Sequence, residues 1–208
     1  PFLLIKRRWK ALIWSAIAGI ALVGLTLPLS GGFDSWVILL QKLPVYSQRP
    51  AMAVSAYQSV SGFFKHQFYF HPVWNPSPLM DLPMLATILT ATTLLMLLLV
   101  TLWQSRHDIH AKWTFCAMLI LGIVVSPATL DYHFMLLLLP ILLLLRDHQQ
   151  MKMPQKILFI LVIVCLSVDY PYQHEMYSQS LMAYPKLIGS LLCWGLVIQM
   201  MPTTEQKM

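Results

Sequence analysis

The stretch from Leu82 to Trp103 reads LPMLATILTATTLLMLLLVTLW and contains no charged side chain. A helix of about 20 predominantly apolar residues crosses the hydrocarbon core of a bilayer, and this stretch reaches that length. It therefore predicts a transmembrane helix. The rest of the chain has to fold around an element that needs a membrane.

Other apolar stretches repeat this pattern along the chain. The chain has 208 residues, of which 58% are hydrophobic and 11% charged, with a mean hydropathy of +0.66. This composition is typical of membrane proteins rather than soluble domains. We predict an all-α polytopic membrane protein with about six transmembrane helices, although several stretches are shorter than a full crossing. The other candidates are Ala11 to Leu29, Trp113 to Leu130, Phe134 to Leu145, Ile157 to Val168 and Leu187 to Met201.

The distribution of basic residues predicts the orientation. An even number of crossings places both ends on one side, and loops on the cytoplasmic side are usually enriched in Lys and Arg. The terminal side carries Lys6, Arg7, Arg8, Lys10, Arg106, Lys112, Arg146, Lys152, Lys156 and Lys207, and the other side carries Lys42, Arg49, Lys65 and Lys186. We therefore expect a multi-pass protein of the cell membrane with both termini in the cytoplasm. The net charge of +6 belongs to the inner face and does not indicate a nucleic-acid partner.

The connection over residues 30–81 is long, and this topology places it outside the cell. Asp34 is a suitable N-cap for a short interfacial helix from Ser35 to Leu43. A second helix is predicted from Pro50 to about Phe68. Its apolar face comprises Ala53, Ala56, Tyr57, Val60, Phe63 and Phe64, while Gln58, Ser61 and Lys65 lie opposite, with Ser59, Gly62 and His66 at the edge.

Two groups of polar residues are candidates for a functional site. Asp131 and His133 follow Ser126-Pro127 at the outer end of two short spans, where ionisable groups are costly and often line a cavity. An ordinary polar turn, with Asp131 capping the next helix, explains them as well. Gln58, Ser59, Lys65 and His66 combine donors and a cation that suit a phosphate, or form the solvated face of an interfacial helix.

The sequence predicts no metal site, no cofactor and no disulfide. His107 and His110 resemble a metal pair only superficially, because their short loop offers no further ligand. Cys116, Cys165 and Cys193 each lie in an apolar span, where a thiol behaves as a small hydrophobic group.

The order of these motifs resembles the C-terminal half of glycosyltransferase family 87. The family pattern is Asn-Gln-Ser-Leu with a Gly and a later basic residue, followed by Ser-Pro-x-Ser-Trp-x-His-His. Departures are Tyr57 in place of Asn, Leu130 in place of Trp and Tyr132 in place of the first His, and Asp131 stands at a variable position. The matching residues are Gln58, Ser59, Gly62, Ser126, Pro127 and His133, with Lys65 near the basic position.

This resemblance implies an integral-membrane enzyme of the GT-C type. Such an enzyme transfers a mannosyl or other hexosyl group from a polyprenol-phosphate sugar to a glycan or glycolipid acceptor on the non-cytoplasmic face, in contact with membrane lipids. The implied substrate-binding residues are Gln58, Ser59, Lys65, His133 and Asp131. An acidic general base deprotonates the acceptor hydroxyl, and the resemblance places this base in an N-terminal half.

The resemblance also bears on the extent of the chain. Residues 1–208 would form the C-terminal transmembrane portion of the enzyme. Because the chain starts at Pro1 and is apolar from Phe2 to Ile5, we expect a fragment that is inactive alone.

Two other classes of protein remain open. In a secondary transporter or a lipid-linked-sugar flippase, Asp131 and His133 would lie on the transport pathway. Transporters often interrupt helices in both of two repeated halves, whereas this chain has one clear interruption, at Ser126-Pro127. A non-catalytic membrane scaffold is the third interpretation.

Overall fold

The computed structural model describes residues 2–47, 49–106, 111–168 and 183–201. Within these ranges the regular elements are helices, and one isolated bridge pairs His71 with Asn75. The prediction of an all-α protein is therefore confirmed for the described chain. Residues 1–49 and 50–208 form two compact units, which are described separately.

The first unit consists of helices α1 (Phe2–Ile5), α2 (Trp9–Thr26) and α3 (Phe33–Ser47). Helix α2 buries none of its residues, and Trp14 and Ile20 are 69% and 73% exposed. The turn after α2 contains Gly31 and Gly32 at φ of 84° and 91°, a left-handed conformation that glycine adopts without steric strain. Helix α3 begins before its predicted start, so Asp34 lies in the first turn, where a carboxylate interacts favourably with the helix dipole.

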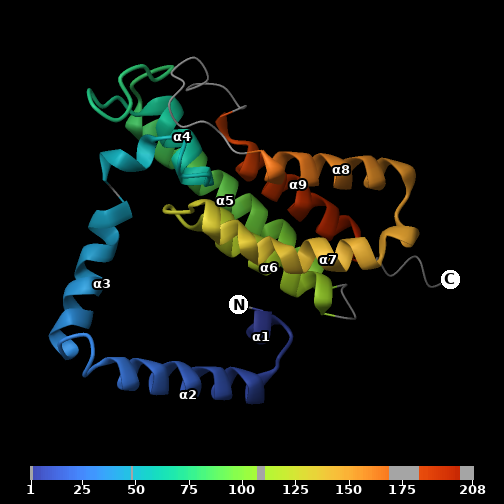
Figure 1. Ribbon diagram of the computed structural model, residues 1–208, viewed down its shortest axis with the longest axis horizontal. Coiled ribbons are helices and arrows are strands. Elements are labelled where there is room, and N and C mark those ends of the chain that lie inside the picture. The colour runs from blue at the N-terminus through green and yellow to red at the C-terminus, as the bar shows by residue number, and fades with distance from the viewer. Residues whose placement is uncertain (1, 48, 107–110, 169–182, 202–208) are drawn as a thin grey trace. The chain divides into compact units, whose positions relative to one another are not determined.

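The second unit is a bundle that holds all the candidate site residues (Figure 1). Helix α4 packs on α5, α5 on α6, and α9 lies against both α6 and α8. The bundle contains η1 (Pro50–Ala53), α4 (Val60–Phe68), α5 (Pro83–Ser105), α6 (Lys112–Val125), η2 (Asp131–Leu137), α7 (Leu138–Arg146), η3 (His148–Gln150), α8 (Met153–Ser167) and α9 (Pro185–Gln199).

Helix α5 shows how its sequence satisfies an apolar environment. Pro83 occupies the start of the helix, where a missing N–H costs no hydrogen bond. The hydroxyls of Thr87, Thr90 and Thr101 donate to the carbonyls of Pro83, Ala86 and Leu97, four residues earlier. These polar groups are thus satisfied inside the helix. Its 23 residues extend about 34 Å, which exceeds the roughly 30 Å of a hydrocarbon core.

Each predicted span overlaps helical structure, but the bounds and lengths differ: α6 ends at Val125 rather than Leu130, and the span from Phe134 to Leu145 is divided between η2 and α7. By length and composition, α2 and α5 can cross a membrane. Helices α6, α8 and α9 have 14, 15 and 15 residues, and α7 has 9 after the 3-10 turns of η2. A helix of 15 residues extends only about 22 Å. The crossing by the other four segments therefore stays a prediction from the sequence.

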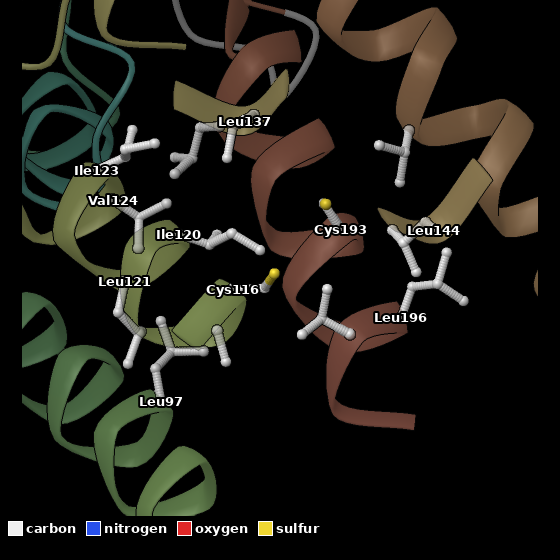
Figure 2. Close-up of a cluster of buried hydrophobic side chains, with 14 of the residues drawn as sticks. Leu97, Cys116, Ile120, Leu121, Ile123, Val124, Leu137, Leu144, Cys193 and Leu196 are labelled. Carbon is white, nitrogen blue, oxygen red and sulfur yellow. The ribbon is translucent and has the colours of Figure 1, made fainter. Parts of the chain in front are cut away.

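The core of the second unit lies between α6 and α9 (Figure 2). Cys116 on α6 points toward Cys193 on α9, while Leu196 on α9 lies beside Leu144 of α7, and all four are fully buried. The outer surfaces are also apolar, since Leu95 on α5 and Ile160 on α8 are 57% and 61% exposed. A surface of this kind is suited to contact with lipid.

Candidate functional site

The connection before α4 differs from the predicted continuous helix over Pro50 to Phe68. Only a short 3-10 turn follows Pro50, and α4 begins at Val60. Ser59 is the N-cap residue, because its Oγ accepts a hydrogen bond from the Gly62 N–H at 3.0 Å. A serine hydroxyl favours this position over the interior of a helix. Gln58 and Ser59 consequently precede the helix and are buried, rather than lying on its polar face.

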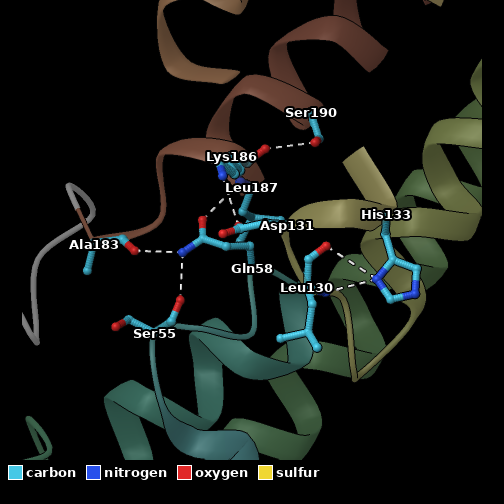
Figure 3. A network of polar contacts seen from close by, with 9 residues as sticks. All are labelled: Ser55, Gln58, Leu130, Asp131, His133, Ala183, Lys186, Leu187 and Ser190. Atoms are coloured by element: carbon cyan, nitrogen blue, oxygen red, sulfur yellow. Dashed lines mark hydrogen bonds and ion pairs between the residues drawn. The ribbon is translucent and has the colours of Figure 1, made fainter. Parts of the chain in front are cut away.

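Gln58 joins three segments that are distant in sequence (Figure 3). Its Nε2 donates to the carbonyls of Ser55 and Ala183 at 2.6 and 2.8 Å, and its Oε1 accepts from the Leu187 N–H at 3.4 Å. Its backbone N–H donates to the Thr129 carbonyl at 3.1 Å. One buried amide side chain thereby fixes the start of α9 against the connection before α4.

The segment after α6 forms the second part of the site. Helix α6 ends at Val125 because Ser126 precedes a proline, which favours the extended backbone that Ser126 adopts. The Thr129 hydroxyl then donates to the carbonyls of Ile123 and Ser126 at 2.5 and 3.0 Å. The Ser59 hydroxyl donates to the Pro127 carbonyl at 3.5 Å. The two candidate motifs therefore meet in space.

Asp131 and His133 lie in this segment but face different surroundings. Asp131 is the first residue of η2 and follows its N-cap residue, Leu130, so it does not itself cap the helix. Its Oδ1 lies 2.9 Å from Nζ of Lys186 on α9. His133 Nδ1 accepts from the Leu130 N–H at 3.0 Å, and its ring lies beyond Leu130, away from Gln58 (Figure 3). The same Nδ1 also lies 3.2 Å from the Leu130 carbonyl oxygen.

His66 on α4 is part of a buried contact with α9. Its Nδ1 lies 2.7 Å from the Tyr184 hydroxyl, which also donates to the Gly62 carbonyl at 3.4 Å. The Tyr184 ring packs edge-on against Phe63 with centroids 5.1 Å apart. Burial lowers the pKa of His66 to about 4, so the ring is neutral at physiological pH. Burial also lowers the pKa of the half-buried Lys65.

Three residues on α9 or just before it were missed by the sequence reasoning: Ala183, Tyr184 and Lys186. They contact Gln58, His66 and Asp131, respectively. The available signal was Lys186, an isolated cation at the start of an apolar stretch. Nothing in the local pattern indicated its partner.

The remaining candidates contribute no metal centre to the described part of the chain. His107 and His110 lie outside the described residues. Cys116, Cys165 and Cys193 are free thiols. Within the described ranges, no three His, Cys, Asp or Glu side chains are grouped as metal ligands would be.

The comparisons with known proteins supply the identity of this arrangement. The sequence model of glycosyltransferase family 87 matches residues 1–127, more than half of the chain. The chain belongs to glycosyltransferase family 87. Enzymes of such a family transfer a sugar from a donor to an acceptor, which supports the transferase interpretation over the transporter and scaffold alternatives.

The family 87 match covers Gln58, Ser59 and Lys65 and ends at Pro127. Asp131, His133 and all of α9 therefore lie beyond it. Searches of curated proteins and of solved structures returned no match.

Proposed function

We propose that the chain is the C-terminal transmembrane portion of a GT-C type glycosyltransferase. It acts on a polyprenol-phosphate-linked hexose, with mannose as the first candidate, and the acceptor is a glycan or glycolipid on the non-cytoplasmic face. The general base belongs to a separate N-terminal half. This half removes the proton from the acceptor hydroxyl as that oxygen attacks the anomeric carbon.

The observation that carries the proposal is the meeting of the two motifs. The Gln58 N–H donates to the Thr129 carbonyl, and the Ser59 hydroxyl donates to the Pro127 carbonyl. Both motifs contain residues that the family match covers. Two distant pieces of sequence that share one family pattern and touch in space are expected of a common binding site.

The site residues divide into two roles in this proposal. The polar side-chain atoms of Gln58 and Ser59 are already bonded to backbone groups, so these residues shape the connection beneath the donor. Lys65 and the imidazole of His133 supply a cation and a hydrogen-bond donor for the donor phosphate. A lipid-linked donor reaches such groups from the bilayer, where its polyprenol chain remains.

The transfer experiment uses the full-length protein in membranes, with a short-chain polyprenyl-phosphate mannose as the donor. We expect His133→Ala to reduce transfer by at least about a hundredfold, as for the loss of a donor that stabilises developing charge. His148→Ala is the matched control, because this exposed histidine lies in η3 outside the site. Wild-type activity of His133→Ala would remove His133 from the site.

The extent of the active enzyme is tested by comparing residues 1–208 alone with the protein encoded by its complete reading frame. We expect transfer from the complete protein and none from residues 1–208, because the base lies in the other half. Adding the N-terminal half as a separate chain should restore activity. Transfer by residues 1–208 alone would place the base within this chain.

The membrane topology is tested with single cysteines. We expect about six crossings, with residues 30–81 outside, from the excess of Lys and Arg on the other side. Val73→Cys, at a position 73% exposed, should react with an impermeant maleimide in intact cells. Gln149→Cys, exposed in η3, should react only after the cells are opened. The reverse pattern would invert the orientation.

A further inference from the structure

Beyond the family match, two consecutive residues expose a carboxylate and an aromatic ring on the surface of the second unit. Asp131 and Tyr132 open η2, directly after the junction that ends α6. The Asp131 side chain is 41% exposed and Tyr132 is 66% exposed. Both are therefore accessible to a ligand that approaches the junction.

The carboxylate of Asp131 is fixed by a cation that is itself buried. The Lys186 side chain is only 10% exposed, and its Nζ lies 2.9 Å from Asp131 Oδ1. Taking an ammonium out of water is costly unless it meets an opposite charge, so Lys186 retains Asp131 as its counter-ion. The Lys186 backbone is anchored in turn by the Ser190 hydroxyl, which donates to its carbonyl at 2.7 Å. An exposed aspartate that would otherwise rotate freely thus has a defined position.

The aromatic ring of the following residue, Tyr132, is also held in place. Tyr132 stacks on the His133 imidazole with centroids 4.2 Å apart and planes inclined by 34°. The Leu130 N–H fixes that imidazole through Nδ1. Tyr132 therefore presents an exposed and supported ring at the position that follows the fixed carboxylate of Asp131 in the sequence.

The chemistry of this pair favours a sugar ring over a phosphate. A carboxylate accepts hydrogen bonds from hydroxyl groups, and such charge-assisted bonds are about twice as strong as neutral ones. It repels an ionised phosphate, which offers no donor. An aromatic face packs against the apolar C–H face of a pyranose, while a few polar groups fix the orientation of its hydroxyls.

We propose that Asp131 and Tyr132 form a sugar-binding subsite that selects the hydroxyl pattern of the hexose, with Lys186 as the residue that positions Asp131. This proposal rests on the proposed transferase function and adds a specificity determinant beyond the family match. The hexose is either the one carried by the donor or the terminal sugar of the acceptor. The hydroxyl chemistry is the same for both.

The test combines substrate analogues with a protein variant. Transfer by the full-length protein is measured with 2-, 3-, 4- and 6-deoxy versions of the donor hexose in one series and of the acceptor sugar in another. For one hydroxyl, we expect the wild type to discriminate against the deoxy analogue by about tenfold or more, and Asp131→Asn to lose this discrimination. If this loss occurs in the donor series, the subsite binds the donor hexose, and if it occurs in the acceptor series, the subsite binds the acceptor sugar.

The subsite proposal would be overturned if Asp131→Asn kept the wild-type discrimination against every deoxy analogue in both series. Asp81→Asn is the matched control, since Asp81 is an exposed carboxylate away from the subsite whose Oδ1 accepts the Phe70 N–H, and it should keep the wild-type discrimination. If Asp131→Asn fails to fold, Tyr132→Leu replaces it, and unchanged KM values for both substrates would also contradict the subsite.

Lys186 is tested by its two nearest replacements. Lys186→Met should raise the KM for the selected sugar by about tenfold with a smaller change in kcat. Lys186→Arg retains the charge and should have a KM close to that of the wild type. A purely structural role for Lys186 would lower the Tm without changing the selection among deoxy analogues.

A binding measurement separates failure of the subsite from failure of the transferase proposal. Saturation-transfer NMR of the full-length protein with methyl α-D-mannopyranoside and methyl α-D-glucopyranoside needs no reaction. We expect pyranose signals that Tyr132→Leu abolishes and Asp81→Asn retains. Pyranose binding without any sugar transfer would reject the proposed transferase reaction and leave the subsite standing. Sugar transfer without pyranose signals, and without loss of discrimination in Asp131→Asn, would reject the subsite and leave the transferase reaction standing.

Discussion

Gly62 lies where the chain has no room for a side chain. A Cβ at this position would lie 2.2 Å from the Tyr57 carbonyl oxygen, whereas ordinary contacts begin at 3.4 Å. In Gly62→Ala the Tyr57 carbonyl must therefore retreat by about 1.2 Å, the difference between these distances. The same planar peptide group carries the Gln58 N–H, which donates to the Thr129 carbonyl, so this movement disturbs the contact between the two motifs.

The expected cost of Gly62→Ala exceeds the gain that alanine brings to a helix. Overpacking costs about 1 to 3 kcal/mol and a distorted hydrogen bond about 1 kcal/mol, whereas replacing a glycine in a helix gains at most about 1 kcal/mol. The net loss is about 1 to 3 kcal/mol, which corresponds to a fall in Tm of about 3 to 10 °C for a chain of this size. The Tm is measured on purified protein in detergent.

Gly122→Ala is the matched control for this prediction. Gly122 lies within α6, and no atom outside its own helix backbone lies within 4 Å of the added Cβ. We expect its Tm to be unchanged or to rise slightly, because alanine favours the helix. If Gly62→Ala had the same Tm as the control, the steric reasoning about the Tyr57 carbonyl would be refuted.

Three further predictions concern hydrogen bonds and ionisation. Tyr184→Phe removes the hydroxyl 2.7 Å from His66 Nδ1, and we expect a loss of about 1 to 3 kcal/mol, read as a lower Tm. Because burial lowers the pKa of His66 from 6.5 to about 4, the unfolded chain binds a proton in this range that the folded chain does not. Stability should therefore be constant above about pH 7 and decline by up to about 3 kcal/mol between about pH 6.5 and 4, and His66→Gln should lack this component of the pH profile. Asp147 contacts Lys112 at 2.5 Å and Arg146 at 2.9 Å, so Asp147→Asn should lower the Tm by an amount equivalent to about 1 kcal/mol at pH 7. Its hydrogen bonds from Arg146 and Lys112 lower the pKa of Asp147, so this difference should persist above about pH 4 and disappear as the pH falls through the folded-state pKa.

Local pattern was sufficient for most of the helices. Apolar runs predicted α5, α6, α7, α8 and α9, and the break after α6 followed from Ser126-Pro127, because a residue before proline favours an extended backbone. The prediction that the helix begins at Pro50 was wrong, and its true start at Val60 could have been predicted. Ser59 stands directly before Val60, and a serine in that place is a recognised start of a helix.

The contacts that complete the candidate site could not be predicted from local pattern. Gln58 meets Ala183 and Leu187 across 125 and 129 residues, and His66 meets Tyr184 across 118. Periodicity reports which face of a helix is apolar and contains no information on which distant segment covers it. The burial of Gln58 and the pairing of Asp131 with Lys186 depend on such a segment, so a reading confined to residues 50–68 and 126–133 treated these side chains as exposed to a ligand.

The hydrogen bonds from Gln58 to Ala183 and Leu187 also determine when the site can form during biosynthesis. Contacts across more than 100 residues make a large contribution to contact order and close late in folding. The chain emerges from the ribosome N-terminus first, so the Gln58 amide is synthesised long before its partners Ala183 and Leu187. Until then it needs water, lipid headgroups or a chaperone to satisfy its polar atoms. The connection before α4 thus reaches its final hydrogen-bonded arrangement only after α9 has been synthesised, so the proposed donor site forms late.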